Sequence, residues 1–401
     1  MPPVDGFRLQ LMHLCRELAG RHEVCVLAGA VPEQAVEMPP GVELVPLERP
    51  SGSAGATAAT TARAILTRTP RRAVTLLPAM RAGVDRVLAG RKFDVAHVAG
   101  PALAAVAPEF GGLPAVLSTL DAWHLNAAAS ANVAPAPLRP FYRLEERSVR
   151  RYGRRSYRAF DRVVVVSDAD AEALRELDPG LAPEVIPNGV DSDELAPNPK
   201  MAREAALVVF TGAMSWAPNE EAALYLAERV LPLLRERRPD ARVAIVGRRP
   251  GPRVRALGTL EGVEVTGEVP DMRPWLWRAS AFACPMASGT GIKNKLLEAL
   301  ACGAPAVVTP LSCQGIDVRP GEELLVASDA EEFADALARL LDDSDLAGRL
   351  ARAGRRMVVE NHSWSSVARS YEQIYEELSG ADDRKRSAGP LGGPQQPAQQ
   401  R

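Results

Sequence analysis

The chain has 401 residues, of which 46% are hydrophobic and 24% charged, and its 48 basic residues against 50 acidic ones give a formal net charge of −2. This balance excludes a nucleic acid or an anionic membrane as a partner reached through bulk electrostatic attraction alone, so any bound anion must be held locally. At about 150 residues per domain, the length predicts two or three domains. The five cysteines form no CxxC pair, which argues against a disulfide scaffold or a zinc knuckle.

The first residues, MPPVDG, contain neither a basic nor an apolar leader segment, so no secretory signal is expected. The longest uncharged run, between Glu298 and Asp317, is interrupted by glycine and proline and cannot form a continuous membrane span. Together with the scattered cysteines, these features predict a cytoplasmic protein.

Short β-branched segments alternate with helical stretches along the whole chain. The expected strands of the first half are residues 24–28, 42–46, 94–98, 115–119, 161–166 and 184–186, and those of the second half are 207–211, 242–246, 263–266, 281–284, 306–309 and 324–326. Such alternation predicts βα units that feed parallel sheets. We therefore expect an α/β fold of two Rossmann-like, doubly wound domains that face a cleft, with ligands at the carboxyl ends of the strands.

The domain boundary is predicted from a segment rich in Pro and Asn-Gly, residues 186–200. We place the N-terminal domain at residues 1–187 and the C-terminal domain at 188–362. Apolar residues at helical spacing predict a last helix over 363–380 that packs back toward the N-terminal domain. The tail, residues 381–401, lacks apolar anchors and is expected to be disordered.

The start of the N-terminal domain does not fit a complete doubly wound sheet. Such a domain opens with a strand that normally lies in the middle of the sheet beside the ligand. Here an amphipathic helix starts almost at the first residue, and its apolar positions are Phe7, Leu11, Leu14, Cys15 and Leu18. We therefore expect an N-terminal domain without its first strand, and hypothesise that the native chain begins upstream of Met1.

The most informative segment is SGTGIKNKLLEAL, residues 288–300, which follows an expected strand and opens a helix near Ile292. Its glycines, Gly289 and Gly291, allow close approach of the backbone to a ligand, and the free N–H groups of a helix start form an anion site. Lys293 and Lys295 in the first turn would oppose the helix dipole unless an anion bound there.

Lys295 and Glu298 share one face of this helix. At about 1.5 Å rise per residue, Glu298 lies roughly 9 Å from the helix start, which is about the span from a pyrophosphate to a ribose. We therefore assign Lys295 and Lys293 to a diphosphate and Glu298 to the ribose hydroxyls of a nucleotide. The alternative is that Lys295 and Glu298 form a surface ion pair.

This segment resembles the donor site of the glycosyltransferase family 4 enzymes of GT-B fold, in the subgroup that reads Gly-Ile-Lys-Asn-Lys-x-Leu-Glu. Further similar stretches occur in the family's order at residues 186–191, at 210–214 with Trp216, Pro218 and Asn219, at 266–273 and at 363–364, so that the resemblance covers about residues 4–380. It implies a nucleotide-sugar donor on the C-terminal domain and an acceptor on the N-terminal domain.

The resemblance also implies roles for individual residues. Those implied to bind the donor are Gly6, Gly212, Val269, Ser288, Gly289, Thr290, Gly291, Lys293, Lys295 and Glu298. Thr290 stands where the family usually has a glutamate that contacts the donor sugar, so the sugar stays open. The arginine and lysine that many members place after the first C-domain strand are not evident either, which gives Lys293 and Lys295 more weight.

On the N-terminal domain, three polar residues lie at the carboxyl ends of expected strands. Asp121 and His97 are catalytic candidates together with Lys295, and Asp121 and His124 are candidates for the acceptor side. A lone histidine at a strand end also has a structural interpretation, and that alternative stays open for His97 and His124.

Two charged segments complete the prediction. The arginine-rich helix at 139–158 is either a solvated face with i,i+4 pairs or a basic rim that attracts an anionic lipid-linked acceptor or a membrane surface. The Asp-Ser-Asp at 191–193 is interpreted as a turn element rather than a metal motif. No metal site and no cofactor are expected.

The sequence thus predicts a retaining, metal-independent hexosyltransferase that moves a sugar from a nucleoside-diphosphate-sugar to an acceptor hydroxyl. Its pathway would be cell-surface polysaccharide or natural-product glycoside biosynthesis, and the acceptor a glycan, a lipid-linked sugar or a small molecule. No nucleic-acid partner is expected, and a cytoplasmic protein could associate peripherally with the inner membrane face. Alternatives are a GT-B nucleotide-sugar epimerase or phosphorylase, and a non-catalytic nucleotide-sugar-binding protein.

Overall fold

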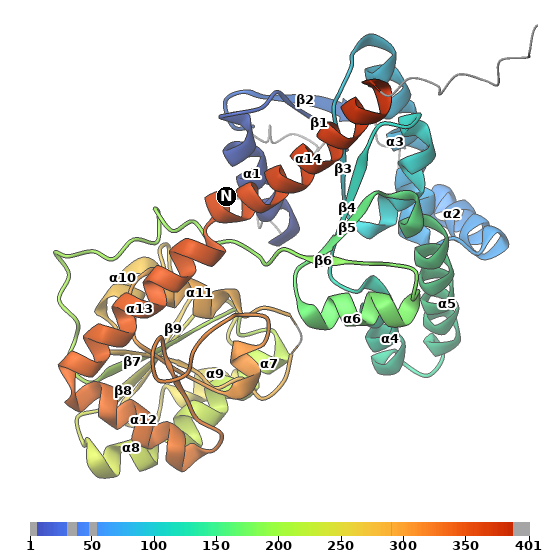
Figure 1. Cartoon of the computed structure of the whole chain (residues 1–401). Coiled ribbons are helices and arrows are strands. Elements are labelled where there is room, and N and C mark those ends of the chain that lie inside the picture. Colours follow the sequence, from blue (N-terminus) through green and yellow to red (C-terminus); the bar gives the residue numbers. More distant parts are fainter. Residues whose placement is uncertain (1–5, 30–37, 48–53, 290, 388–401) are drawn as a thin grey trace, which may run out of the picture. The chain divides into compact units, whose positions relative to one another are not determined.

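The computed structural model describes residues 6–29, 38–47, 54–289 and 291–387 (Figure 1). The chain forms two compact units. Unit 1 comprises Met1–Ile186 and Ala368–Arg401, and unit 2 comprises Pro187–Val367. The last helix, α14 (Trp364–Ser387), starts in unit 2, and its residues from Ala368 onward belong to unit 1.

Unit 1 is an α/β unit whose strands all pair in parallel. Its strands are β1 (Val24–Gly29), β2 (Val42–Leu47), β3 (Ala96–Ala99), β4 (Ala115–Leu120), β5 (Arg162–Val165) and β6 (Glu184–Val185). Its helices are α1 (Gly6–Ala19), α2 (Ala54–Thr67), α3 (Arg71–Gly90), η1 (Pro101–Phe110), α4 (Trp123–Val133), α5 (Arg139–Ser156), η2 (Tyr157–Ala159) and α6 (Asp168–Leu177), besides its part of α14.

The strands of unit 1 that the structure describes form two separate sheets, β1-β2 and β3-β4-β5-β6. A single doubly wound sheet would join β1 to β3 through a strand between them. Among the residues that the structure describes, no strand lies between β1 and β3 to join the two sheets. Helix α3 packs closely on the first sheet, because an added Cβ on its Gly83 would lie 2.3 Å from Leu47 on β2 and 3.1 Å from Leu27 on β1. Its Leu77 and Val84 belong to the same buried core as Val98 of β3.

The part of helix α14 that belongs to unit 1 (Figure 1) runs from Ala368 onward. It packs there through Tyr371, which is buried, and Tyr375, which is partly buried. The Tyr371 hydroxyl lies 2.9 Å from the Ser118 hydroxyl on β4, and the Tyr375 hydroxyl lies 2.6 Å from a ring nitrogen of His97 on β3. Nearer the surface, the Glu372 carboxylate accepts two hydrogen bonds from the Arg21 guanidinium, and its Oε1 lies 2.8 Å from Nε2 of His22. These groups fix the helix on the β3-β4 sheet.

Unit 2 contains one six-stranded parallel sheet in the order β12-β11-β10-β7-β8-β9. Its strands are β7 (Leu207–Thr211), β8 (Arg242–Val246), β9 (Val263–Gly267), β10 (Ala281–Cys284), β11 (Ala306–Val308) and β12 (Leu325–Val326). Its helices are α7 (Ala217–Tyr225), η3 (Leu226–Val230), α8 (Leu231–Arg237), α9 (Pro252–Leu257), α10 (Arg273–Arg278), α11 (Asn294–Ala301), η4 (Pro310–Cys313), α12 (Ala330–Asp342) and α13 (Ser344–His362), before α14 begins.

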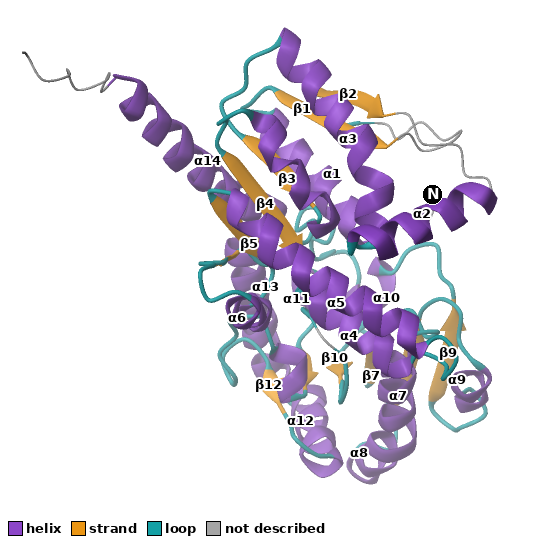
Figure 2. Ribbon diagram, turned by 90° about the vertical axis from the view of Figure 1, so that its right-hand side faces the viewer, coloured by secondary structure: helices purple, strands orange, loops and turns teal. Residues whose placement is uncertain are grey.

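The sheet of unit 2 is covered on both faces. All five residues of the central strand β7 are buried, as are all residues of β10 and β11, which is typical of a parallel sheet between helices. Figure 2 shows the strands of this sheet with helices beside them. The carboxyl ends of β7, β8 and β10 therefore emerge from a rigid core, which suits a site built on the loops that follow them.

The predicted α/β fold is confirmed, and each of the twelve expected strands overlaps an observed strand within one or two residues. Helix α11 begins at Asn294 rather than near Ile292. Helix α14 runs to Ser387, so residues 381–387 of the tail expected to be disordered are helical, while 388–401 lie outside the described residues. None of the helices within the described ranges combines the length and the apolar character needed to cross a bilayer.

Candidate functional site

The loops after β7 and β8 touch each other through their backbones. Gly212 donates its N–H to the carbonyl oxygen of Val246 at 3.1 Å. Gly247 has φ +153°, and an added Cβ there would lie 1.8 Å from the carbonyl oxygen of Gly212. A backbone atom cannot move aside as a flexible side chain can, so this contact requires glycine at position 247.

The glycine-rich loop after β10 packs on the start of α7. Gly289 has φ +103°, and an added Cβ would lie 2.8 Å from the Trp216 ring and 3.5 Å from Pro218. The Ser288 hydroxyl donates to Oε2 of Glu221 at 2.8 Å. Thr290 lies outside the described residues. The loop is thus held against α7 from two sides.

Lys293 is buried, with 4% of its surface exposed, and its ammonium folds back onto the same loop. Nζ donates to the carbonyl oxygen of Gly289 at 3.1 Å and to that of Gly291 at 2.7 Å. Burial lowers the pKa of this lysine. Two of its three donors are used within the chain, so Lys293 shapes the loop and has one donor left for a ligand.

Lys295 is the second residue of α11, and its ammonium reaches the carboxyl end of β7. Nζ donates to Oδ1 of Asn219, lies 3.6 Å from Sδ of Met286 and sits 4.8 Å from the centre of the Phe210 ring. Burial lowers the pKa of Lys295. An added Cβ on Gly212 would lie 3.2 Å from Nζ, which places the ammonium against the loop after β7.

Glu298 lies on the next turn of α11 and is partly buried. Burial raises its pKa, and the positive charge of Lys295 opposes that rise. Within the described part of the chain, its carboxylate makes no hydrogen bond or ion pair, and Lys295 pairs with Asn219 instead. The alternative interpretation, a surface ion pair between Lys295 and Glu298, is therefore not what the helix forms.

Val269 lies two residues after β9 and packs, partly buried, against the core of unit 2. The loop that carries it is held by Asp271, whose carboxylate accepts hydrogen bonds from the backbone N–H and the guanidinium of Arg273. Gly6, by contrast, is the first residue of α1 and not part of a loop. The structure therefore gathers the candidates of unit 2 on neighbouring loops and leaves Gly6 at a helix start.

Asp121 follows β4 directly in unit 1. Its carboxylate accepts a hydrogen bond from Nδ2 of Asn126 at 2.7 Å. The loss of surrounding water raises the pKa of Asp121, while that hydrogen bond lowers it. The preceding Leu120 has φ +68°, a left-handed conformation that costs about 1–3 kcal/mol in a non-glycine residue. The residue types around Leu120 do not indicate this conformation.

His97 has both ring nitrogens bound. One lies 2.6 Å from the Tyr375 hydroxyl, and the other lies 2.7 Å from the Ser118 hydroxyl. Burial lowers the pKa of His97 to about 4, so the ring is neutral at physiological pH. These contacts favour the structural alternative for this residue, because a catalytic role would first break one of them.

His124 lies in the first turn of α4 with only 3% of its surface exposed. Burial, assisted by the positive charges of Arg150 and Arg154, lowers its pKa to about 4. A buried, neutral ring of this kind again favours the structural alternative. Of the three N-terminal candidates, Asp121 alone presents an exposed side chain.

The Asp-Ser-Asp segment is a turn element, as interpreted from the sequence, because Asp191 Oδ1 accepts the Glu194 N–H at 3.0 Å. Among the residues that the structure describes, no cluster of three His, Cys, Asp or Glu side chains could hold a metal ion.

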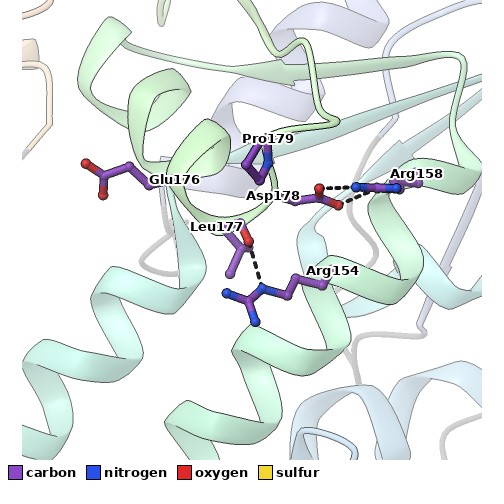
Figure 3. A pocket seen from close by; sticks show the side chains of 6 residues that line it. All are labelled: Arg154, Arg158, Glu176, Leu177, Asp178 and Pro179. Atoms are coloured by element: carbon purple, nitrogen blue, oxygen red, sulfur yellow. Dashed lines mark hydrogen bonds and ion pairs between the residues drawn. The ribbon is translucent and has the colours of Figure 1, made fainter.

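A surface hollow of about 470 Å³ lies in unit 1 between the end of α5 and the end of α6 (Figure 3). Arg158 pairs with Asp178, and Nε of Arg154 donates to the carbonyl oxygen of Leu177 at 2.7 Å. These arginines hold the connection after α6, and none of the candidate residues lines the hollow. It is therefore not assigned to the site.

Two family models match the chain, one in each unit. The model for "Glycosyltransferase Family 4" matches residues 4–194, and the model for "Glycosyl transferases group 1" matches residues 205–343. Among solved structures, sucrose-phosphate synthase from Thermosynechococcus elongatus superposes with a TM-score of 0.68 at 17% identity, covering 94% of each chain. WaaG, a glycosyltransferase involved in lipopolysaccharide biosynthesis, superposes with a TM-score of 0.59 at 16% identity, covering 94% of this chain and 97% of that one.

Curated relatives are mannosyltransferases. The chain is 33% identical over 214 residues to phosphatidyl-myo-inositol mannosyltransferase of Mycolicibacterium smegmatis, covering 51% of this chain and 54% of that protein. It is 29% identical over 311 residues to the MMP alpha-(1->4)-mannosyltransferase of Mycolicibacterium hassiacum, covering 73% and 72%. The chain thus matches about half the length of the phosphatidyl-myo-inositol mannosyltransferases.

Fold and matches together define the class of the molecule: its two α/β units have the GT-B fold of glycosyltransferases. Within that class, the two family models and the mannosyltransferase relatives support glycosyltransferase family 4 for this chain.

The contact between Gly289 and Trp216 makes a prediction about the loop. Replacement of Gly289 by Ala should lower the free energy of unfolding of unit 2 by about 2–4 kcal/mol, because a left-handed residue gains a Cβ that meets the indole. Gly291→Ala is the matched control, since Gly291 has φ +73° but open space around its Cβ, and should cost about 1 kcal/mol. Urea unfolding measures both.

A double-mutant cycle with Trp216→Ala isolates the steric part of this cost. Removal of the indole should reduce the penalty of Gly289→Ala toward that of Gly291→Ala. An unchanged penalty in the Trp216→Ala background would show that the loop does not pack on Trp216.

Proposed function

We propose that this chain transfers a sugar from a nucleoside-diphosphate-sugar to an acceptor hydroxyl, with retention of configuration at the anomeric carbon. The observation that carries the proposal is the position of Lys295, whose ammonium is held at the carboxyl end of β7. One turn further along α11 lies Glu298, whose carboxylate has no hydrogen-bond or ion-pair partner among the described residues. Glycine-rich loops after β7, β8 and β10 surround the same ends of the sheet. In this proposal the diphosphate binds the Lys295 ammonium, and the ribose hydroxyls donate hydrogen bonds to the Glu298 carboxylate.

In the proposed reaction the bond between the anomeric carbon and the diphosphate oxygen breaks, and a bond from the acceptor oxygen to the anomeric carbon forms. The acceptor's proton leaves with the departing diphosphate. Lys295 and the first N–H groups of α11 balance the charge that develops on the leaving group. Because this chain supplies that charge itself, we propose a metal-independent reaction. Retention is inferred from the family resemblance.

The relatives suggest which substrates to test first. The names of the relatives specify mannosyl transfer, in several cases to phosphatidyl-myo-inositol and in one case with dependence on GDP-mannose. We therefore propose GDP-mannose as the first donor to test and a glycan or glycolipid precursor of the cell surface as the acceptor class. The missing glutamate at Thr290 leaves other sugars to be compared with it.

The surface of unit 1 favours an anionic lipid or lipid-linked acceptor. Helix α5 exposes arginines, among them Arg143 and Arg147, beside the exposed apolar side chains of Tyr142 and Leu144. In the neighbouring α2, Leu66 has 84% of its surface exposed. Arginines mixed with exposed apolar side chains are typical of surfaces that bind anionic membranes. We therefore propose peripheral association with the cytoplasmic face of the inner membrane.

Two substitutions test the donor site. Glu298→Ala should weaken donor binding by about tenfold or more through loss of the ribose hydrogen bonds, and Lys295→Ala should lower kcat by about a hundredfold or more through loss of leaving-group stabilisation. Thermal shifts with GDP-mannose, UDP-glucose and UDP-N-acetylglucosamine measure binding, because a ligand at a hundred times its Kd stabilises by about 2.7 kcal/mol. Sugar transfer measures rate.

The matched controls are Glu331→Ala and Lys200→Ala, which remove an exposed glutamate and an exposed lysine elsewhere in unit 2. If Glu298→Ala and Lys295→Ala behave like these controls, the site assignment is wrong. Donor binding without transfer to any of a broad set of acceptors would support the non-catalytic alternative, and a changed sugar after incubation with donor alone would support the epimerase.

Membrane association makes a separate prediction. The wild-type chain should float with vesicles of phosphatidylcholine and phosphatidylglycerol but not with phosphatidylcholine alone. A double variant, Arg143→Glu with Arg147→Glu, should bind the anionic vesicles at least tenfold more weakly, since each basic residue near the surface contributes about 1 kcal/mol. Arg349→Glu with Arg352→Glu on α13 makes the same charge change on exposed positions of unit 2 and should leave flotation unchanged.

A further inference from the structure

Asn219 lies in the first turn of α7 with 4% of its surface exposed, and both ends of its side-chain amide are used. Nδ2 donates to the carbonyl oxygen of Ala213 at 3.0 Å, and Oδ1 accepts from the Lys295 ammonium. An ammonium can only donate, so the amide oxygen must face it. The bond to Ala213 fixes that orientation from the other side.

The glycine before Ala213 makes room for this amide. An added Cβ on Gly212 would lie 2.7 Å from Nδ2 of Asn219 and 3.2 Å from Nζ of Lys295. The loop after β7, the first turn of α7 and the first turn of α11 therefore meet at one point. A buried asparagine that only joined α7 to its own loop would not need a lysine from another helix.

The remaining contacts of Lys295 are weak and non-directional. The Phe210 ring and Sδ of Met286 form an apolar floor under the ammonium. A lysine side chain has a flexible four-carbon stem, and contact with apolar groups alone does not fix its ammonium in one position. Among the side chains that the structure describes, Asn219 supplies the one full-strength hydrogen bond that does.

The chain's choice of basic residue supports a dedicated role for this ammonium. Of the 48 basic residues only five are lysines, at positions 92, 200, 293, 295 and 385. Two of these five lie in the glycine-rich segment. An ammonium directs its three donors tetrahedrally, whereas a planar guanidinium does not, so Lys295 can bind Asn219 and still direct a proton to a ligand.

We propose that Asn219 is a positioning residue, which holds the Lys295 ammonium at the carboxyl end of β7 so that its free N–H faces the donor diphosphate. This inference rests on the proposed function for the role of the diphosphate, but the pairing of Asn219 with Lys295 is tested independently of it. Asn219 touches no reacting atom in this account and acts only through Lys295.

Substitutions of Asn219 should change the titration of Lys295 in opposite directions. The charged and titratable groups around Lys295 are Cys284 on β10, Lys293 just before α11 and Glu298 on α11, and burial lowers the pKa of Lys295. Asn219→Asp places a carboxylate at the same distance and should raise that pKa. Asn219→Leu removes the acceptor and should lower it further, because nothing then stabilises the charged form.

The five lysines make this titration observable. Lysine labelled with ¹³C and ¹⁵N gives five side-chain signals, and Lys295→Arg identifies the one from residue 295. GDP, UDP and inorganic pyrophosphate serve as binding probes across the same pH range. The matched control is Asn198→Asp, which changes an asparagine in the segment before β7 whose Oδ1 accepts a backbone N–H of Lys200.

We expect the pKa of Lys295 to follow the order Asn219→Asp above wild type above Asn219→Leu, with Asn198→Asp equal to wild type. Diphosphate affinity at neutral pH should fall about tenfold or more in both Asn219 variants. In Asn219→Asp the new carboxylate neutralises the Lys295 ammonium, and in Asn219→Leu the ammonium loses the hydrogen bond that holds it in place. The alkaline pH at which affinity is lost should shift with the lysine's pKa, because only the protonated amine binds the anion.

If Asn219 has only a structural role, both variants will have a lower melting temperature, but the pKa of Lys295 and the alkaline pH at which diphosphate affinity is lost will be those of wild type. That result would overturn the proposal. If wild type binds none of the three probes, the proposed function fails, and the lysine titration alone then decides whether Asn219 positions Lys295. If the titration moves but the affinity does not, the positioning role is wrong.

Discussion

A positive charge held in a partly apolar place is the interaction on which the site of unit 2 depends. Removing an ammonium from water costs several kcal/mol unless a polar partner replaces the lost hydration. Lys295 receives that replacement from one amide oxygen and an aromatic ring, and both belong to the central strand β7 or the helix that follows it. The charge is therefore fixed relative to the rigid core of the sheet.

The surrounding backbone is arranged around the same point. The contact of Gly247 with the carbonyl of Gly212 brings the β7 and β8 loops together, and Gly289 brings the β10 loop against Trp216. Lys293 uses its ammonium on the carbonyls of that last loop. The two neighbouring lysines thus differ in their contacts: Lys293 stabilises the conformation of the loop after β10, whereas the Lys295 ammonium is held at the carboxyl end of β7.

The fold could be predicted almost completely, because β-branched runs and helical periodicity are local signals. The twelve strands follow from them. The sequence predicts that α11 starts near Ile292, whereas the helix begins at Asn294. Lys293 therefore lies before the helix, and its ammonium donates to the carbonyl oxygen of Gly291 in the preceding loop. Local pattern does not reveal how a side chain folds back.

The site could be predicted only in part, because its decisive contacts join residues far apart in the chain. Asn219 and Lys295 are 76 positions apart, and His97 meets Tyr375 across 278. The strained Leu120 beside Asp121 is a backbone property that residue type does not announce. Sequence spacing predicts that Lys295 and Glu298 share one face of α11, whereas the hydrogen-bond partner of Lys295, Asn219, could be found only from the fold.

Hydrogen exchange with and without GDP and UDP tests the central claim most directly, which is that a nucleoside diphosphate binds at the carboxyl ends of β7 and β10. The account predicts that ligand slows exchange in two separate segments at once, residues 211–219 and 288–298, and leaves the hollow at the end of α5 unaffected. Protection confined to unit 1, or binding without protection of both segments, would contradict it.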